Sequence, residues 1–522
     1  MRRLSGRAYF IGVKCLNDNL YALLEQRFAE AGDSPAFTLP GRAGLSYAEL
    51  LRKVARYANA LRELGVQPDD RVTVQVEKSL ANVALYLAVM KVGAVYQPLN
   101  TAYTAAEVDY FVGDARPRLI VCDPKRRAAM DDLADKQDVP AVETLDAEGE
   151  GTLAELAAGM AEEAETAHRD ADDLAGLLYT SGTTGRSKGA MLTHRNLSSN
   201  ALTLVDLWRF QPGDVLLHAL PIFHVHGLYV ALNTAFLNRS EIIWLPKFDL
   251  DQILAQLPRS TILMGVPTFY TRLLGDPRFT RELCANMRLF IAGSAPLLAE
   301  THREFEARTG HRILERYGMT ECGMITSNPY DGDRVPGTVG FPLPGVSVRI
   351  CDAEGKELPR GEIGMLETNG PNRFKGYWQM PEKTAEEIRP DGFFITGDLA
   401  TMDEEGRVSI VGRGKDLIIS GGFNVYPKEI EAELDALPGV GESAVIGVPH
   451  PDFGEAVVAV ITPSGPTPPE EAALIEHLGK TLAKFKVPKR IFVIDELPRN
   501  TMGKVQKAEL RKQYADLFAA KS

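Results

Sequence analysis

The sequence predicts an α/β protein, and three patterns near its N-terminus carry this prediction. Residues 71–77 alternate polar and apolar side chains as a strand does, and residues 79–94 form the long apolar run of a buried helix. Residues 118–123 predict a further short strand, which is followed by charged, helical sequence. Repeated alternation of strands and helices favours largely parallel sheets covered by helices.

Two flanking segments complete this first region. Residues 45–64 carry apolar side chains at helical spacing, and Ser46 with Glu49 three positions later forms a capping-box pattern at the start. Residues 146–173 are acidic and alanine-rich, which predicts an exposed helix and a connector.

The composition changes after about residue 340, where glycine and proline become dense. Short β-like runs at 346–352 and 363–370 predict a small β-rich subdomain. From about residue 414 the pattern is strand, glycine turn, helix, two strands, helix and strand, which predicts a compact α+β module. The segment "GRGKD" at 412–416 is the candidate hinge before it.

We therefore expect three parts. They are a disposable basic extension (1–16), a large N-terminal domain of two α/β sheet subdomains and a small β-rich subdomain (17–414), and a small mobile α+β C-terminal domain (415–522).

Bulk properties exclude some classes of function. The 522 residues contain 58 Lys and Arg against 70 Asp and Glu, so the net charge of −12 gives no general attraction to nucleic acid. The five cysteines are scattered without a C-x-x-C pair, which favours a reducing, cytoplasmic location and argues against a zinc or disulfide framework. The basic residues 1–16 leave an organellar location open.

Residues 215–238 carry no formal charge over more than the length of a membrane span. They contain histidines and a proline, so they predict the wall of a buried pocket and no membrane helix.

The segment "LYTSGTTGRSKG" at 178–189 concentrates hydroxyl groups and glycines directly after apolar residues. Such a loop can hold phosphates, but the spacing differs from a Walker loop because Lys188 follows Ser187 and precedes Gly189. The segment binds phosphates by another design, or it is an ordinary solvated loop.

Four further segments follow in order: "GSAPL" (293–297), "RYGMTE" (316–321), "TGD" (396–398) with "GRGKD" (412–416), and "PRNTMGK" (498–504). Each alone is more often a turn or a surface group than a site. Together with "YTSGTTGRSKG" they resemble the adenylate-forming superfamily that includes acyl-CoA synthetases, over residues 20 to 510.

The resemblance implies a two-step reaction with ATP, Mg²⁺ and coenzyme A. A carboxylate attacks the α-phosphate to give an acyl-adenylate, and the thiol of coenzyme A then displaces AMP. Both reactants of the first step are anions, so the site must stabilise negative charge on the phosphate oxygens.

The resemblance also implies residue roles. Lys504 is the mobile catalytic lysine, Glu321 and Thr180 are catalytic and bind Mg²⁺, and Lys415 is the hinge. The loop holds the leaving β- and γ-phosphates, Tyr317 stacks on adenine, Thr320 contacts the α-phosphate, Asp398 with Arg413 binds the ribose, and Gly421 with Gly422 lines the thiol tunnel. The full nucleotide and coenzyme set is Thr180, Ser181, Gly182, Thr183, Thr184, Gly185, Lys188, Gly293, Ser294, Ala295, Pro296, Glu315, Arg316, Tyr317, Gly318, Met319, Thr320, Asp398, Arg413, Gly421 and Gly422.

The acid should be held by His224 and His226 within the uncharged segment. Segments such as "LHALPIFHVHGL" and "SNPYDGDRVPG" resemble malonyl-CoA synthetases, which also accept methylmalonate. A second carboxylate needs a cation, and arginine suits it best. Arg288 is the first choice and Arg239 the second, although either alone is more often a surface ion-pair residue. Cys322 has no assigned role.

Two alternatives remain open: an acetyl- or short- to medium-chain fatty acyl-CoA synthetase, and a non-catalytic nucleotide-binding scaffold. Glu321 together with Lys504 argues against the scaffold, because folding needs neither residue. The expected partners are small molecules (a dicarboxylic acid, ATP and coenzyme A), with no nucleic acid and no membrane span. Acetylation of Lys504 by a lysine acetyltransferase would remove its charge and silence the enzyme.

Overall fold

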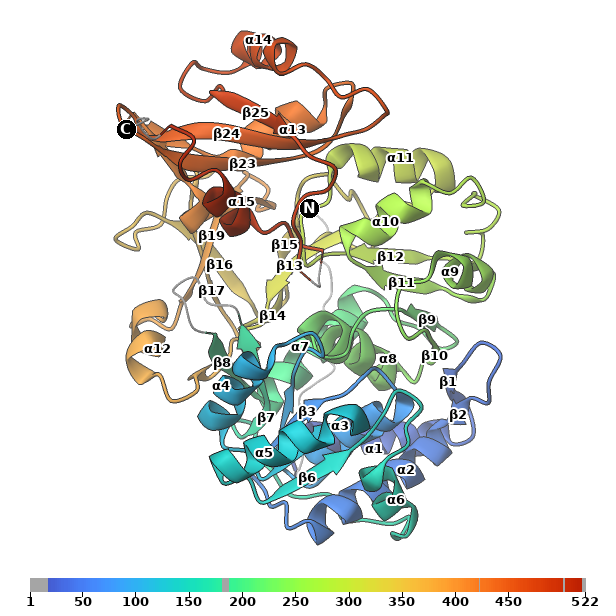
Figure 1. The fold of residues 1–522 in the computed structure, drawn as a ribbon. Helices are drawn as coiled ribbons and strands as arrows, with labels where there is room; N and C mark the ends of the chain where they lie inside the picture. The colour runs from blue at the N-terminus through green and yellow to red at the C-terminus, as the bar shows by residue number, and fades with distance from the viewer. Residues whose placement is uncertain (1–16, 181–186, 422, 501–502, 519–522) are drawn as a thin grey trace. The chain divides into compact units, whose positions relative to one another are not determined.

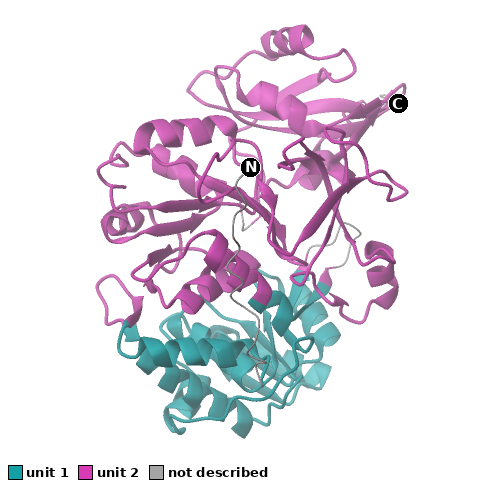
Figure 2. Cartoon of the chain, turned by 180° about the vertical axis from the view of Figure 1, so that it is seen from behind, with its two compact units in different colours: residues 1–34, 45–179, 189–198 teal, residues 35–44, 180–188, 199–522 magenta. Residues whose placement is uncertain are grey.

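The computed structural model describes residues 17–180, 187–421, 423–500 and 503–518, and it confirms the expected α/β architecture with several sheets (Figure 1). The predicted extension 1–16 lies outside the described residues. The chain forms two compact units (Figure 2): unit 1 comprises residues 1–34, 45–179 and 189–198, and unit 2 comprises residues 35–44, 180–188 and 199–522. This division differs from the predicted boundary at residue 414, which stays a prediction.

Unit 1 is built on a sheet with the strand order β8-β7-β4-β3-β5-β6, in which β3 pairs in parallel with β4 and β5. The strands are β3 (Arg71–Gln75), β4 (Val95–Pro98), β5 (Leu119–Cys122), β6 (Ala141–Thr144), β7 (Leu174–Thr180) and β8 (Lys188–Thr193). The helices are α1 (Leu20–Ala31), α2 (Tyr47–Glu63), α3 (Leu80–Lys91), α4 (Ala105–Ala115), α5 (Arg127–Gln137) and α6 (Thr152–Ala158), and α7 (His194–Leu207) continues into unit 2.

The local signals in this unit are confirmed. Ser46 caps α2, because its hydroxyl accepts a hydrogen bond from the Glu49 N–H at 3.2 Å while the Glu49 carboxylate accepts from the Ser46 N–H at 2.7 Å. Every residue of α3 except Leu80 is fully buried, as the apolar run predicts. Of the acidic segment 146–173, only the seven residues of α6 are helical.

Unit 2 contains a larger sheet with the strand order β15-β14-β13-β12-β11-β9-β10-β1. In this sheet the neighbours β1, β10, β9, β11, β12 and β13 pair in parallel, whereas β14 pairs antiparallel with β13 and with β15. The strands are β1 (Pro35–Thr38), β9 (Val215–His218), β10 (Glu241–Trp244), β11 (Ile262–Gly265), β12 (Leu289–Ala292), β13 (Leu314–Met319), β14 (Gly323–Ser327) and β15 (Phe341–Pro342). The helices α8 (Asn233–Asn238), α9 (Leu250–Gln256), α10 (Pro267–Leu274) and α11 (Ala299–Thr309) connect them (Figure 1).

The β-rich subdomain is an antiparallel sheet with the order β16-β17-β19-β20. Its elements are β16 (Ser347–Cys351), β17 (Gly364–Asn369), β19 (Phe394–Met402) and β20 (Val408–Arg413), with β18 (Gly376–Tyr377) and α12 (Pro381–Glu387) between β17 and β19. Residues Asp398 and Arg413 are directly opposite each other across β19 and β20.

The C-terminal module is a sheet with helices on both faces. Its elements are β21 (Ile418–Ser420), β22 (Phe423–Val425), α13 (Pro427–Asp435), β23 (Val440–His450), β24 (Gly454–Pro463), α14 (Glu471–Thr481), β25 (Arg490–Val493) and α15 (Lys507–Gln513). Val445 packs with residues of α13 and α14, whereas its neighbours Ala444 and Ile446 pack with Leu510 of α15. This alternation is that of a strand buried on both faces.

The uncharged segment 215–238 forms β9, the π-helix His226–Leu232 and α8, and its π-helix is fully buried. No helix among the described residues is long and apolar enough to cross a membrane.

Candidate active site

The predicted site begins where parallel strands β12 and β13 of unit 2 end. Ala292, the last residue of β12, pairs with Glu315 of β13, so "GSAPL" leaves the sheet beside "RYGMTE", whose first four residues continue β13. In open α/β sheets ligands bind beyond the carboxyl ends of such strands. The segment from Gly293 to Pro296 and the residues Gly318, Met319 and Thr320 therefore lie at the edge where the nucleotide was expected.

Arg316 is the buried cation at this edge. Its side chain is 4% exposed, and burial lowers the pKa of its guanidinium to about 10. Its Nε and Nη2 have no hydrogen-bond partner within the described part of the chain. A Cβ at Gly293 would lie 2.2 Å from Arg316 Nη1, so only glycine leaves room for the guanidinium there. A buried cation without a partner is costly, which is typical of a site built for an anion.

Two histidines and a serine lie close to this arginine. Ser294, whose φ is 72°, places its Oγ 3.2 Å from Nδ1 of His226. The backbone N–H of His226 donates to Nδ1 of His224 at 3.3 Å. Burial, followed by the charge of Arg316, lowers the pKa of His224 to about 4 and that of His226 well below its usual value. Both imidazoles are therefore neutral, and the positive charges beside His224 are those of Arg316 and Lys504.

The two arginines expected to bind the second carboxylate have other environments. Arg288 donates from Nε to Asp214 Oδ1 at 2.7 Å and from Nη2 to Asp214 Oδ2. Arg239 is exposed at the C-terminal end of α8, where its φ is 61°. The charge of the Arg288 guanidinium is already balanced by Asp214, so the structure does not support the expected contact between Arg288 and the second carboxylate of a substrate.

The predicted ribose contacts come together on β19 and β20. Arg413 Nε lies 2.8 Å from Asp398 Oδ1, and the hydroxyl of Tyr317 donates to Asp398 Oδ2. Burial, followed by the charge of Asp398, raises the pKa of Tyr317 well above its usual value. Three residues from distant motifs thus form one polar cluster.

Lys504 approaches the same cluster. Its backbone N–H donates to Asn500 Oδ1 at 2.9 Å in a turn that Gly503, with a φ of 73°, allows. Burial, followed by the charge of Arg413, lowers the pKa of Lys504 to about 8. The predicted hinge Lys415 also contributes to that shift, so it lies near the same ammonium.

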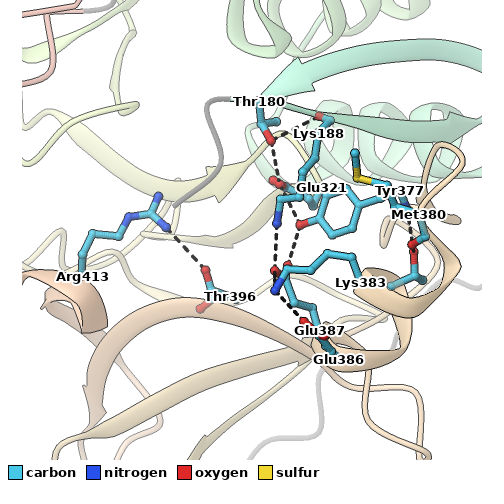
Figure 3. A network of polar contacts seen from close by, with 11 residues as sticks. Thr180, Lys188, Glu321, Tyr377, Met380, Lys383, Glu386, Glu387, Thr396 and Arg413 are labelled. Carbon is cyan, nitrogen blue, oxygen red and sulfur yellow. Dashed lines mark hydrogen bonds and ion pairs between the residues drawn. The ribbon is translucent and has the colours of Figure 1, made fainter. Parts of the chain in front are cut away.

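A second polar cluster contains Glu321, the last residue of "RYGMTE", together with Thr180 and Lys188 (Figure 3). The hydroxyl of Thr180 is 3.4 Å from Glu321 Oε1 and 3.5 Å from the carbonyl oxygen of Lys188. Glu321 is 5% exposed, and burial raises the pKa of its carboxyl. Both predicted metal ligands therefore present oxygen atoms to one point.

The donor set fits a hard cation that arrives with a phosphate. The described residues contain no group of three or more His, Cys, Asp and Glu that could hold a metal ion. Mg²⁺ binds through one or two carboxylates together with substrate phosphates and water, so a single buried carboxylate suffices.

The sequence analysis missed two members of this cluster, Tyr377 of β18 and Glu387 of α12. Lys188 Nζ lies 2.8 Å from Glu387 Oε1 and 4.0 Å from the centre of the Tyr377 ring. No local pattern links Lys188 to a residue 199 positions away, so only the fold reveals the contact.

Other expected nucleotide contacts differ or cannot be placed. Glu315 is used within the protein, because its Oε1 lies 3.3 Å from His302 Nδ1 and accepts from the Gly337 N–H at 3.3 Å. Gly421 has a φ of 58°, as a tight turn requires. Ser181, Gly182, Thr183, Thr184, Gly185 and Gly422 lie outside the described residues.

Comparison with known proteins places this fold and site in a family. Residues 24–378 match the AMP-binding enzyme family, and residues 429–504 match the AMP-binding enzyme C-terminal domain. The chain belongs to the AMP-binding enzymes.

Relatives with different acids in their names are similarly close in sequence. The chain is 36% identical to a feruloyl-CoA synthase of Amycolatopsis (91% of this chain, 95% of the relative) and 36% identical to a mitochondrial malonate–CoA ligase of Mus musculus (86% and 83%). Among solved structures, ATP-bound MatB from Rhodopseudomonas palustris is 59% identical with a TM-score of 0.93, covering 96% of this chain and 100% of that chain.

Proposed function

We propose that this protein is a malonate–CoA ligase. It joins malonate to AMP with release of pyrophosphate, and it then transfers the malonyl group to coenzyme A with release of AMP. The observation that carries the choice of acid is the buried guanidinium of Arg316, which has two nitrogens without a partner beside His226.

Arg316 distinguishes malonate from the monocarboxylate alternative. One carboxylate of malonate must meet the α-phosphate, so the other needs a cation a short distance away. Arginine binds a carboxylate through two parallel hydrogen bonds. Acetate or an apolar acyl tail would leave the buried charge without a partner, which disfavours those acids. The malonate–CoA ligases among the relatives support the same choice.

The remaining residues account for the first half-reaction. Asp398 accepts hydrogen bonds from the ribose hydroxyls, held in place by Arg413 and Tyr317. Lys188 donates to the leaving phosphates, and Lys504 bridges the attacking carboxylate and the α-phosphate. Glu321 and Thr180 would hold Mg²⁺, which supplies positive charge to the phosphate oxygens.

The neutral histidines suit this step. His224 and His226 keep their imidazoles uncharged because burial lowers their pKa values. As neutral groups they can orient the carboxylate of the acid by hydrogen bonding, while Arg316 forms the ion pair with it.

The second half-reaction requires coenzyme A to reach the adenylate. Gly421 is proposed to border the thiol path, and Lys415 is the proposed hinge. Acetylation of Lys504 and a cytoplasmic location stay predictions, and the relative from Mus musculus is described as mitochondrial.

The test is a panel of malonate, methylmalonate, acetate and butyrate, assayed for AMP release with coenzyme A. Breaking a buried ion pair costs about 3–5 kcal/mol, so malonate should exceed acetate by about 10²–10³ in kcat/KM. Arg316→Met should remove most of this gap, chiefly by the loss of malonate turnover. A wild-type preference for butyrate, or an unchanged malonate preference in Arg316→Met, would reject the assignment.

A further inference from the structure

Glu387, on the short helix α12, contacts three donors: Lys188 of β8, Tyr377 of β18 and Lys383 of α12 itself (Figure 3). Its Oε1 lies 2.8 Å from Lys188 Nζ and 3.3 Å from Lys383 Nζ, and its Oε2 lies 2.6 Å from the hydroxyl of Tyr377. The side chains of Lys188 and Glu387 are 8% and 20% exposed, so water screens their attraction only weakly.

Tyr377 lies between two carboxylates and has one hydrogen to donate. Its hydroxyl oxygen is 2.6 Å from Glu387 but 3.2 Å from Glu321 Oε1, so the shorter bond goes to Glu387. Glu321 has that long contact, the 3.4 Å contact with Thr180 and a hydrogen bond from its own backbone N–H. Glu387 thus takes the strong donors of the cluster, and Glu321 keeps oxygen lone pairs free.

We propose that Glu387 is a positioning residue that holds the Lys188 ammonium against Tyr377 and away from Glu321. An ammonium has three N–H donors, so Lys188 can bond Glu387 and still donate to phosphate oxygens. The inference rests on the nucleotide-binding part of the proposed function and is independent of the choice of acid.

The reason is the position of the two carboxylates around one flexible lysine. If Glu387 lost its charge, the remaining carboxylate bridged to the same Tyr377 hydroxyl would be Glu321. Lys188 would then pair with Glu321, and one contact would occupy both the phosphate-binding lysine and the proposed cation ligand. A nucleotide would have to break that pair before it could bind.

The experiment compares ATP and AMP, because only ATP carries the β- and γ-phosphates. Binding of each nucleotide is measured by calorimetry on the whole protein, as wild type, Glu387→Gln and Glu386→Gln. Glu386 is the matched control, since it lies on the same helix, is 65% exposed and pairs with Lys383 at 2.8 Å. We expect Glu387→Gln to weaken ATP about tenfold, as for one charge-assisted hydrogen bond, and to change AMP by less than about twofold.

Two further variants test the cause. Glu387→Asp keeps the charge with a shorter reach and should bind ATP with intermediate affinity. In a Glu321→Gln background, Glu387→Gln should weaken ATP much less, because the competing carboxylate is gone.

Equal losses for ATP and AMP would show that Glu387 only supports the fold, and tighter ATP binding would show that it competes with the phosphates. Either result overturns the inference. Wild-type protein that bound neither nucleotide would instead overturn the proposed function, and this inference with it.

Discussion

The guanidinium of Arg288 is held by the carboxylate of Asp214, with Nε 2.7 Å from Oδ1 and a second bond from Nη2 to Oδ2. The Asp214 side chain is 1% exposed and that of Arg288 is 14% exposed. This is a buried, bidentate ion pair, in which each side chain balances the charge of the other.

We therefore expect Arg288→Leu to lower stability and to leave the preference for malonate unchanged. Removing one partner of a buried pair costs about 3–5 kcal/mol in the free energy of unfolding, because Asp214 would keep an uncompensated charge. Denaturant unfolding and the malonate-to-acetate ratio of kcat/KM measure the two effects. The double variant Arg288→Leu/Asp214→Leu should regain part of the stability. If a stable Arg288→Leu protein lost the preference for malonate, Arg288 would be the residue that binds the second carboxylate.

The rate of adenylation should fall above about pH 8. In its proposed role Lys504 must carry its charge to bridge two anions, and burial, followed by the charge of Arg413, lowers the pKa of Lys504 to about 8. The ammonium is protonated below that pH and loses its proton above it. We expect kcat/KM for pyrophosphate exchange to be level below pH 8 and to fall about tenfold per pH unit above it.

Lys504→Arg is the control for this profile, because arginine keeps its charge throughout the range. Whatever its absolute rate, its profile should lack the fall near pH 8. A fall that persists in Lys504→Arg would assign the titration to another group.

Lys504→Ala should separate the two half-reactions. The charge of Lys504 serves the attack of the carboxylate on ATP, so formation of the acyl-adenylate should fall by about 10²-fold or more, as expected when a preorganised charge is removed. Thioester formation from supplied malonyl-AMP and coenzyme A should remain largely intact. Similar losses in both steps would show a structural role for Lys504.

Lys415→Pro should give the opposite asymmetry. Proline fixes φ near −65°, so a hinge that must adopt two backbone states would be confined to one. We expect adenylation to survive and thioester formation from the same adenylate to fall more steeply. Unchanged overall turnover would place the hinge elsewhere.

Asp435 on α13 should make stability depend on pH. Burial raises the pKa of Asp435 from 3.8 to about 7, and its Oδ1 has no hydrogen-bond partner among the described residues. The folded state therefore holds this proton more tightly than the unfolded state, and stability falls as pH rises from about 4 through 7.

Asp435→Asn should remove this effect. At pH 8 the variant should be more stable than wild type by roughly 1–2 kcal/mol, a value reduced for partial exposure of the carboxyl. At pH 4.5 most of the difference should disappear. Glu433→Gln on the same helix controls for the loss of one charge, and an equal gain in that variant would assign the effect to net charge.

The sequence predicted those features that depend on neighbours along the chain. The capping box of Ser46 and Glu49 is complete within four residues. Family motifs extended this to distant residues, since they singled out Tyr317, Asp398 and Arg413 separately, and these three residues contact one another in the structure.

The environment of each arginine could not be predicted in this way. The sequence analysis weighed Arg288 and Arg239 for the second carboxylate and placed Arg316 among the nucleotide contacts. Arg288 is paired with Asp214, which lies 74 residues before it and reaches it only in the folded chain. The Lys188–Glu387 contact was not predicted for the same reason, because tertiary packing brings these two distant residues together.

Gly293 and Arg316 have an evolutionary consequence as a pair. A Cβ at position 293 would lie 2.2 Å from the guanidinium, so the two positions cannot vary independently. A lineage that replaced the arginine by a short side chain would free position 293 for a larger one, and on the proposed role of Arg316 the site could then accept an acid without a second carboxylate. Sequences of related enzymes should therefore show covariation between these positions. An engineer who wishes to change the acid should alter both residues in one step, since a larger residue at 293 alone collides with the arginine.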